Sequence, residues 1–135
     1  MISAELQVAL HNSFVRAHEK HHKWITVEHL LLQLMDAPDV QERLRSREVD
    51  ETGLWRDLEH QVSQTAIFLA NEETDTQPTA AFQKAIQYAI DVVQKARRTE
   101  VTPLDVLHIV VAHPECLAPN SPVQLRIASF KWQAE

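Results

Sequence analysis

Residues 6–34, LQVALHNSFVRAHEKHHKWITVEHLLLQL, recur in altered form at residues 82–110, FQKAIQYAIDVVQKARRTEVTPLDVLHIV. A constant offset of 76 positions aligns the two stretches without a gap and places Thr26 opposite Thr102. A repeat of this length indicates a duplicated supersecondary unit whose halves pack on each other, and two copies are too few for a solenoid. The sequence therefore predicts one compact, pseudo-symmetric domain. The aligned apolar pairs are Leu6/Phe82, Leu10/Ile86, Phe14/Ile90, Ala17/Val93, Ile25/Val101, Leu30/Val106, Leu31/Leu107 and Leu34/Val110.

The composition narrows the class of protein. The chain has 135 residues, of which 44% are hydrophobic and 24% are charged, as is ordinary for one globular domain with a core. Its single glycine, Gly53, argues against a β-sandwich or barrel, because those folds use glycine at hairpins and bulges. Glycine-rich loops that cradle phosphates need at least two glycines. We therefore expect no nucleotide hydrolysis within this chain and no cofactor.

The charge and the single cysteine suggest a cellular setting. The formal net charge of −6 disfavours nucleic acid and anionic membrane surfaces as partners, since both attract a basic face. Cys116 is the one cysteine, so the chain forms no internal disulfide, which fits a reducing compartment. The N-terminal residues lack the pattern of a signal peptide, and no stretch is long and apolar enough for a membrane span. We expect a soluble cytoplasmic protein.

Apolar periodicity and capping residues predict an all-α domain. Side-chain caps are expected from Ser3, Thr26 and Thr79, and Thr102-Pro103 is a further helix start. No segment shows the alternation of a strand. Helices are predicted at about 4–19, 26–34, 38–47 and 51–66, followed by a polar linker at about 70–78, a long helix after Thr79, a helix from Thr102 to His113, and a short final helix at about 122–132. Repeat one is then about 1–66, repeat two about 79–112, and 113–135 is a divergent tail.

Several stretches resemble a known family. TVEHLLLQL at 26–34, ELQVALHNSFVRAHEKHHKW at 5–24 and TDTQPTAAFQKAIQYAI at 74–90 occur in the order found in the N-terminal domain of the Clp/Hsp100 unfoldases, and they are most similar to the ClpA type. The resemblance covers about residues 1–112. It implies two four-helix repeats related by a pseudo-two-fold axis. It also implies a module without catalytic activity that receives protein substrates or adaptors for ATP-dependent proteolysis.

The resemblance further implies where a partner binds. In ClpA-type domains a ClpS-type adaptor docks around the first helix and the start of the second. By this likeness Glu28 is the foremost candidate contact, and Val27, Thr26, Lys23 and His22 are weaker candidates. Glu28 can also be explained without a partner, because an acid in the first turn of a helix stabilises the helix by about 0.3–1 kcal/mol.

Three departures from the family pattern qualify this expectation. ClpC-type domains read phosphoarginine with a glutamate in each repeat, but the repeat mate of Glu28 is Leu104, so no such pair is expected. Lys23 lies where ClpA-type domains carry an acid. Residues 113–135 do not match the family, so that the second repeat is altered at its C-terminal end. Two interpretations stay open. The chain is either a free-standing protein, which competes for the adaptor or serves as an accessory subunit of the unfoldase, or a piece of a longer unfoldase.

The histidines support a rival hypothesis. His18 and His22 are four residues apart, which places them on one helical face if the first helix extends that far. Two imidazoles at this spacing can bind zinc or nickel, so a small metal-responsive protein is one alternative, although only adventitious binding is expected. A folded remnant of a truncated unfoldase is another. Cys116 has no base placed beside it by the sequence, so we expect no thiol catalysis.

Overall fold

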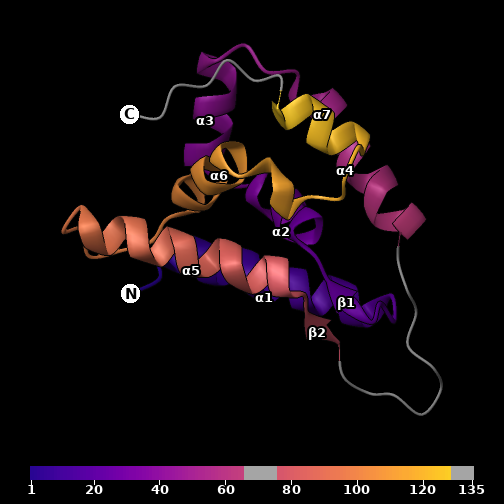
Figure 1. Cartoon of the computed structure of the whole chain (residues 1–135), viewed down its shortest axis with the longest axis horizontal. Helices are drawn as coiled ribbons and strands as arrows, with labels where there is room; N and C mark the ends of the chain where they lie inside the picture. The colour runs from indigo at the N-terminus through magenta and orange to yellow at the C-terminus, as the bar shows by residue number, and fades with distance from the viewer. Residues whose placement is uncertain (66–75, 129–135) are drawn as a thin grey trace.

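The computed structural model describes residues 1–65 and 76–128 and confirms the all-α prediction (Figure 1). The described elements follow from the predicted caps and apolar stripes. They are α1 (Ala4–Glu19), β1 (Trp24–Ile25), α2 (Val27–Leu34), α3 (Pro38–Ser46), α4 (Glu51–Thr65), β2 (Gln77–Pro78), α5 (Ala80–Lys95), α6 (Pro103–Ala112), a 3₁₀ turn η1 (Pro114–Cys116) and α7 (Pro122–Ala128).

The first two helices of each repeat begin in the same way. The Ser3 hydroxyl accepts the Leu6 N–H at 3.1 Å, and the Thr79 hydroxyl accepts the Phe82 N–H at 3.1 Å. Thr26 and Thr102 cap α2 and α6 in capping boxes, in which the hydroxyl and the residue three positions later satisfy each other's backbone N–H groups. Each of these pairs is separated by the offset of 76.

The long helices also end in the same way. After α1 the His21 and His22 N–H groups donate to the carbonyls of His18 and Ala17. After α5, the residues 76 positions later make the same two bonds. This is a Schellman closure, and it needs a left-handed residue, which His21 supplies at φ 56° and Arg97 at φ 57°. The closure turns the chain back, so His22 and its counterpart Arg98 face the helix that follows.

Short extended segments join the two repeats across the pseudo-two-fold axis. Ile25 of β1 pairs in parallel with Pro78 of β2, and the Thr79 N–H donates to the Ile25 carbonyl at 3.0 Å. The equivalent bridge joins Ile2 to Val101, with the Ser3 N–H donating to the Val101 carbonyl at 2.9 Å. The sequence predicted no strands, and in this respect the prediction was wrong. Two residues are too few to show an alternating pattern.

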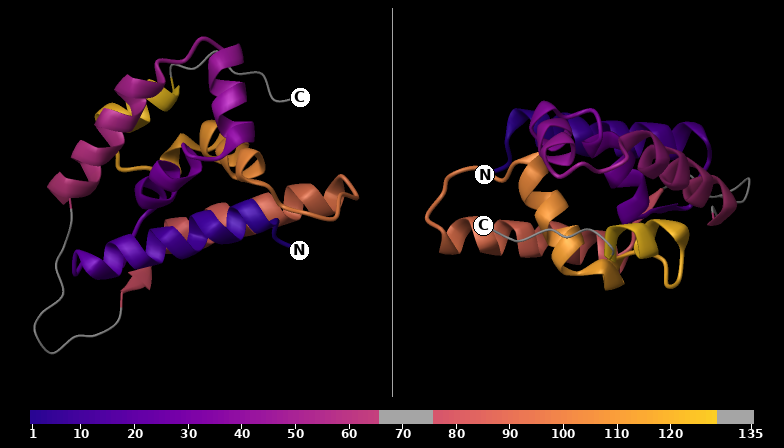
Figure 2. Two further views of the ribbon diagram at one scale, coloured as in Figure 1. Left: turned by 180° about the vertical axis from the view of Figure 1, so that it is seen from behind. Right: turned by 90° about the horizontal axis from the view of Figure 1, so that it is seen from above.

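The core lies between the repeats. Seen from above, α1 to α4 occupy one side and α5 to α7 the other, with α6 reaching into the middle (Figure 2). The apolar stripes predicted from periodicity supply much of the core, with Leu6, Leu30, Leu34, Val106 and Val110 fully buried. Phe14 is 39% exposed and meets Phe82 edge-on across the repeat interface.

The repeats differ at their C-terminal ends, as predicted. Pro38 opens the nine-residue α3, whereas Pro114, at the same place in repeat two, opens only the three-residue turn η1. The helix that follows is also short, with seven residues in α7 against fifteen in α4. Arg126 holds α7 on α4 through a 2.8 Å bond to Asp57. The rest of the predicted 122–132 helix, and most of the predicted 70–78 linker, lie outside the described residues. Within the described segments, no helix has the length and apolarity needed to cross a membrane.

Candidate protein-interaction site

Three of the five predicted contact residues, His22, Lys23 and Thr26, lie in the segment that joins α1 to α2, and Val27 and Glu28 lie in the first turn of α2. The structure places them at different depths. His22, Val27 and Glu28 are buried, with exposed fractions of 4%, 1% and 4%. Thr26 and Lys23 are half-buried. The sequence signals therefore point to one region, but only its outer part is available to a partner without rearrangement.

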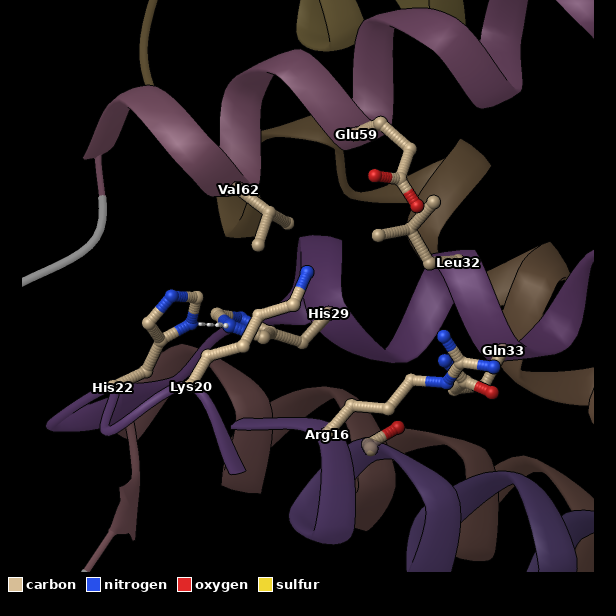
Figure 3. A pocket seen from close by; sticks show the side chains of 9 residues that line it. Arg16, Lys20, His22, His29, Leu32, Gln33, Glu59 and Val62 are labelled. Atoms are coloured by element: carbon tan, nitrogen blue, oxygen red, sulfur yellow. Dashed lines mark hydrogen bonds between the residues drawn. The ribbon is translucent and has the colours of Figure 1, made fainter. Parts of the chain in front are cut away.

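A pair of imidazoles anchors this segment. His22 Nδ1 and His29 Nε2 are 2.9 Å apart and share a hydrogen bond, with the rings edge to face (Figure 3). The other His29 nitrogen, Nδ1, lies 3.1 Å from the Thr26 N–H and 2.8 Å from the Thr26 hydroxyl, which completes the capping box. His29 therefore fastens the α1–α2 turn to the first turn of α2. The sequence analysis did not single out His29, although its alignment with the capping residue Asp105 was a usable signal.

Both imidazoles are held neutral at physiological pH. Burial, together with the charges of His22 and Lys20, lowers the pKa of His29 from 6.5 to about 4. Burial and the nearby Lys20 ammonium also lower the pKa of His22. A neutral imidazole carries one N–H and one free lone pair, so the pair forms a single N–H···N bond. Protonation of both rings would leave two donors facing each other.

The Glu28 carboxylate accepts a hydrogen bond from a loop of the second repeat. Its Oε2 accepts the N–H of Ala118 at 2.9 Å, from the loop between η1 and α7. Burial, with the charges of Glu28 and Glu115, raises the pKa of Cys116, the last residue of η1, to about 12. Cys116 is therefore a thiol at neutral pH, and a thiol is a weak nucleophile. The assignment of Glu28 as a partner contact stays a prediction, since the carboxylate already has a bond within the chain.

Lys23 and Trp24 lie on the surface of the segment, just before β1 turns into the core. Trp24 is 38% exposed, and the Lys23 ammonium lies 5.9 Å from the centre of its ring, within the range of a cation–π contact. Half-exposed tryptophans with a nearby cation are the kind of side chain that often dominates binding energy at interfaces. Lys23 and Thr26 are therefore the accessible members of the predicted set, and the neighbouring Trp24 adds an exposed aromatic side chain.

The two predicted metal candidates differ in their surroundings. His18 is exposed on the last turn of α1, whereas His22 is buried against His29. The Schellman closure separates them, because it ends the helix before His22. Among residues 1–65 and 76–128, no group of three His, Cys, Asp or Glu side chains is placed to hold a metal ion.

The fold and the buried turn between α1 and α2 define an all-α domain of two pseudo-symmetric helical repeats. Comparison with known proteins identifies the family. The Clp repeat (R) N-terminal domain family matches residues 1–117, and the chain belongs to this family. In related proteins this domain is a non-catalytic interaction domain. The match extends past residue 112, where the sequence resemblance was expected to end.

Individual relatives agree with this assignment. A ClpA homolog protein of Fuscovulum blasticum is 36% identical over 115 residues, which cover 84% of this chain but 14% of the relative. The chain thus spans about one seventh of that protein. The N-terminal domain of the ClpV1 ATPase from E. coli EAEC superposes with a TM-score of 0.77 at 16% identity, over 95% of this chain and 77% of the other. A ClpV N-domain in complex with VipB peptide superposes at 0.70 and 16% identity, over 92% and 74%.

Proposed function

We propose that this chain is a protein-interaction module of a Clp unfoldase system, which binds a ClpS-type adaptor or protein substrates through its first repeat. The observation that carries the proposal is the family match over residues 1–117, most of the described chain. The similarity to a ClpA homolog supports the ClpA-type assignment, and a structural neighbour is known with a bound peptide.

The exposure of each residue supports a division of roles within the contact region. Lys23 and Trp24 are the accessible members of the region, so they make the direct contacts in this proposal. The half-buried Thr26 contributes an edge contact, and the buried Val27 and His22 act indirectly by fixing the course of the α1–α2 segment. Glu28 acts by fixing the start of α2 against the loop at Ala118.

Calorimetric titration with the ClpS-type adaptor from the same source tests the proposal. We expect binding in the micromolar range or tighter. Trp24→Ala is expected to weaken it at least tenfold, which corresponds to about 1.4 kcal/mol. Lys23→Glu restores the acid that the ClpA-type resemblance assigns to this position, and is expected to tighten binding.

Trp55→Ala is the matched control, because Trp55 is 47% exposed and lies on α4, outside the contact region. The control variant should bind as the unchanged chain does. No heat at high adaptor concentration would refute adaptor docking. Equal losses for Trp24→Ala and Trp55→Ala would refute the assigned surface.

A further inference from the structure

Two surface grooves occupy equivalent places in the repeats. Groove one lies between α1, the end of α2 and the start of α3, and encloses about 210 Å³. Groove two lies between α5, α6 and η1, and encloses about 230 Å³. Groove one is lined by Glu5, Val8, Ala9, Asn12, Gln33, Asp36, Ala37 and Pro38, and groove two by Ala81, Lys84, Ala85, Tyr88, Ile109, His113, Glu115 and Cys116.

The same scaffold positions carry different side chains in the two grooves. Ala9 and Ala85 form equivalent parts of the apolar floor, separated by the offset of 76. Gln33 of groove one is replaced by Ile109 in groove two, and Glu5 by Ala81. The duplicated backbone alone therefore explains why two grooves exist. It does not explain why groove one contains two amides and two acids.

Gln33 is the unusual feature of groove one. Its side chain lies on the buried face of α2 with an exposed fraction of 8%, and it borders both groove one and the pocket that Arg16 and Glu59 line (Figure 3). Its amide makes no hydrogen bond with any other residue of the described segments. A buried amide without a partner costs about 1–3 kcal/mol, whereas the apolar residue of the second repeat at this place carries no such cost. This cost is offset when a bound molecule supplies the missing hydrogen bonds.

The rim of groove one has an uncompensated negative charge. Glu5 and Asp36 are both exposed at the groove, and neither forms an ion pair within the described residues. None of the lining residues is a lysine, arginine or histidine. Glu5 lies in the first turn of α1, and Asp36 lies just before the N-cap of α3, so a helix N-terminus is close to each acid.

We propose that groove one binds a peptide segment of a partner protein, in which an apolar side chain stands next to a lysine or arginine. The apolar side chain fills the floor at Val8 and Ala9. The Gln33 amide pairs with the N–H and C=O groups of the peptide backbone, and the cation lies between Glu5 and Asp36. The inference rests on the proposed function and gives it a second contact region.

The volume and the chemistry of the groove fit this ligand. A cavity of roughly 150 Å³ accommodates benzene, so about 210 Å³ holds one large apolar side chain. An amide offers both an acceptor and donors, which matches a peptide group, whereas a lone cation would use only the acceptor. Exposed charges at the rim select the partner through complementarity more than they raise its affinity.

NMR titration of the ¹⁵N-labelled chain with two capped peptides tests the proposal. Both are short sequences of glycine, serine and alanine with one central Leu-Arg or Leu-Glu pair. We expect the Leu-Arg peptide to bind at least tenfold more tightly and to shift the side-chain amide signal of Gln33. Equal affinity for the two peptides, or no binding of the Leu-Arg peptide, would overturn the proposal.

Three variants separate the proposed contacts from effects on folding. Gln33→Ile installs the residue of repeat two and should lose at least tenfold in affinity while its melting temperature is unchanged or higher. The double variant Glu5→Ala/Asp36→Ala changes only exposed side chains and should abolish the preference for arginine. Glu115→Ala in groove two is the control and should change nothing. Retained affinity in both groove-one variants would refute the assignment.

The adaptor titration makes the two proposals distinguishable. If the adaptor binds and the peptides do not, groove one is not a peptide site and the proposed function stands. If the Leu-Arg peptide binds selectively while the adaptor does not, groove one is confirmed and the module receives substrates directly. If neither binds, both proposals fail.

Discussion

In each repeat a turn joins the long helix to the next helix. An ion pair stabilises this turn in repeat two, and a pair of neutral histidines stabilises it in repeat one. In repeat two, Arg98 donates to both oxygens of Asp105 at 2.7 and 2.8 Å. In repeat one the equivalent positions, 76 residues earlier, are His22 and His29, which share one hydrogen bond at 2.9 Å. The backbone conformation is the same in both, including the left-handed residue and the capping box. The same backbone conformation is thus stabilised by a charged pair in repeat two and by a neutral pair in repeat one.

Because of this difference, the two pairs lose their stabilising effect over different ranges of pH. Burial raises the pKa of Asp105, but hydrogen bonds from Arg98 and Thr102 outweigh this, and the net pKa is below 3.8. The pair in repeat two therefore stays ionised until strongly acidic pH. The pair in repeat one depends on deprotonated imidazoles, and it weakens at a pH at which the other pair is intact.

The largest expected effect is a loss of stability in mild acid. The folded-state pKa of His29, about 4, lies below its unfolded value of 6.5, so the unfolded chain binds the proton more readily. The stabilisation is complete above about pH 6.5 and is lost as the pH falls toward 4. At 1.36 kcal/mol per unit of pKa difference, we expect a loss of about 3 kcal/mol, measured by urea unfolding from pH 7 to 4.

His29→Gln serves as the control for this measurement. Glutamine at this capping-box position keeps the contact with the backbone of Thr26 but does not titrate. Its unfolding free energy should change much less over the same range. Lys20, Arg16 and Glu59 line the same pocket, and the Lys20 charge lowers the pKa of both imidazoles. Equal pH slopes for the two proteins would show that the histidine pair is not the cause.

Transplanting the pair of repeat two into repeat one should reverse the acid sensitivity. His22→Arg with His29→Asp places the Arg98–Asp105 chemistry on an equivalent backbone. At pH 4.5 the double variant should be more stable than the unchanged chain by about 2 kcal/mol, because the protonation cost is removed. Thermal melts at pH 4.5 and 7 measure the effect. Lower stability at both pH values would mean that the two turns are not interchangeable.

Breaking the pair in repeat two is expected to have a similar or slightly smaller effect. Asp105→Asn replaces charged hydrogen bonds to Arg98 and Thr102 with neutral ones, and should cost about 2 kcal/mol at pH 7 in urea unfolding. Arg98→Ala should cost less, because the Arg98 side chain is 45% exposed and water replaces part of its bond. A larger loss in Arg98→Ala than in Asp105→Asn would contradict this ranking.

The smallest effect is expected at Glu28. Glu28→Gln keeps an acceptor for the Ala118 N–H but removes the charge, and should cost about 1 kcal/mol in stability. It should also lower the pKa of Cys116, because the carboxylate is one of the groups that raise it. The alkylation rate of Cys116 by iodoacetamide, measured against pH, reports this shift. An unchanged pH profile would show that Glu28 does not act on the thiol.

Much of the fold could be predicted because helix signals are local. Ser3, Thr26 and Thr79 cap the expected helices, and the 76-residue offset reproduces even the hydrogen bonds between the repeats. The altered end of repeat two was also predicted, from the sequence after residue 112. The short strands were missed, since they arise where caps from different repeats meet.

The candidate site could be predicted only in part. The likeness to ClpA-type domains selected the α1–α2 segment, which is where the accessible Trp24 lies. The sequence could not show that Glu28 is covered, because its partner, Ala118, comes from a loop 90 positions away. In the sequence, Gln33 looks like an ordinary polar residue of an apolar helix. Its burial depends on how α1, α2 and α3 pack around it, which no local pattern encodes.

The most direct test of the central claim, that this domain binds protein partners through its first repeat, is an NMR titration of the ¹⁵N-labelled chain with the ClpS-type adaptor. We predict saturable shifts that centre on Lys23, on Trp24 with its indole N–H, and on the neighbouring start of α2. Signals from α5 and α7 should move little. No shifts at high adaptor concentration, or shifts confined to the second repeat, would contradict the claim.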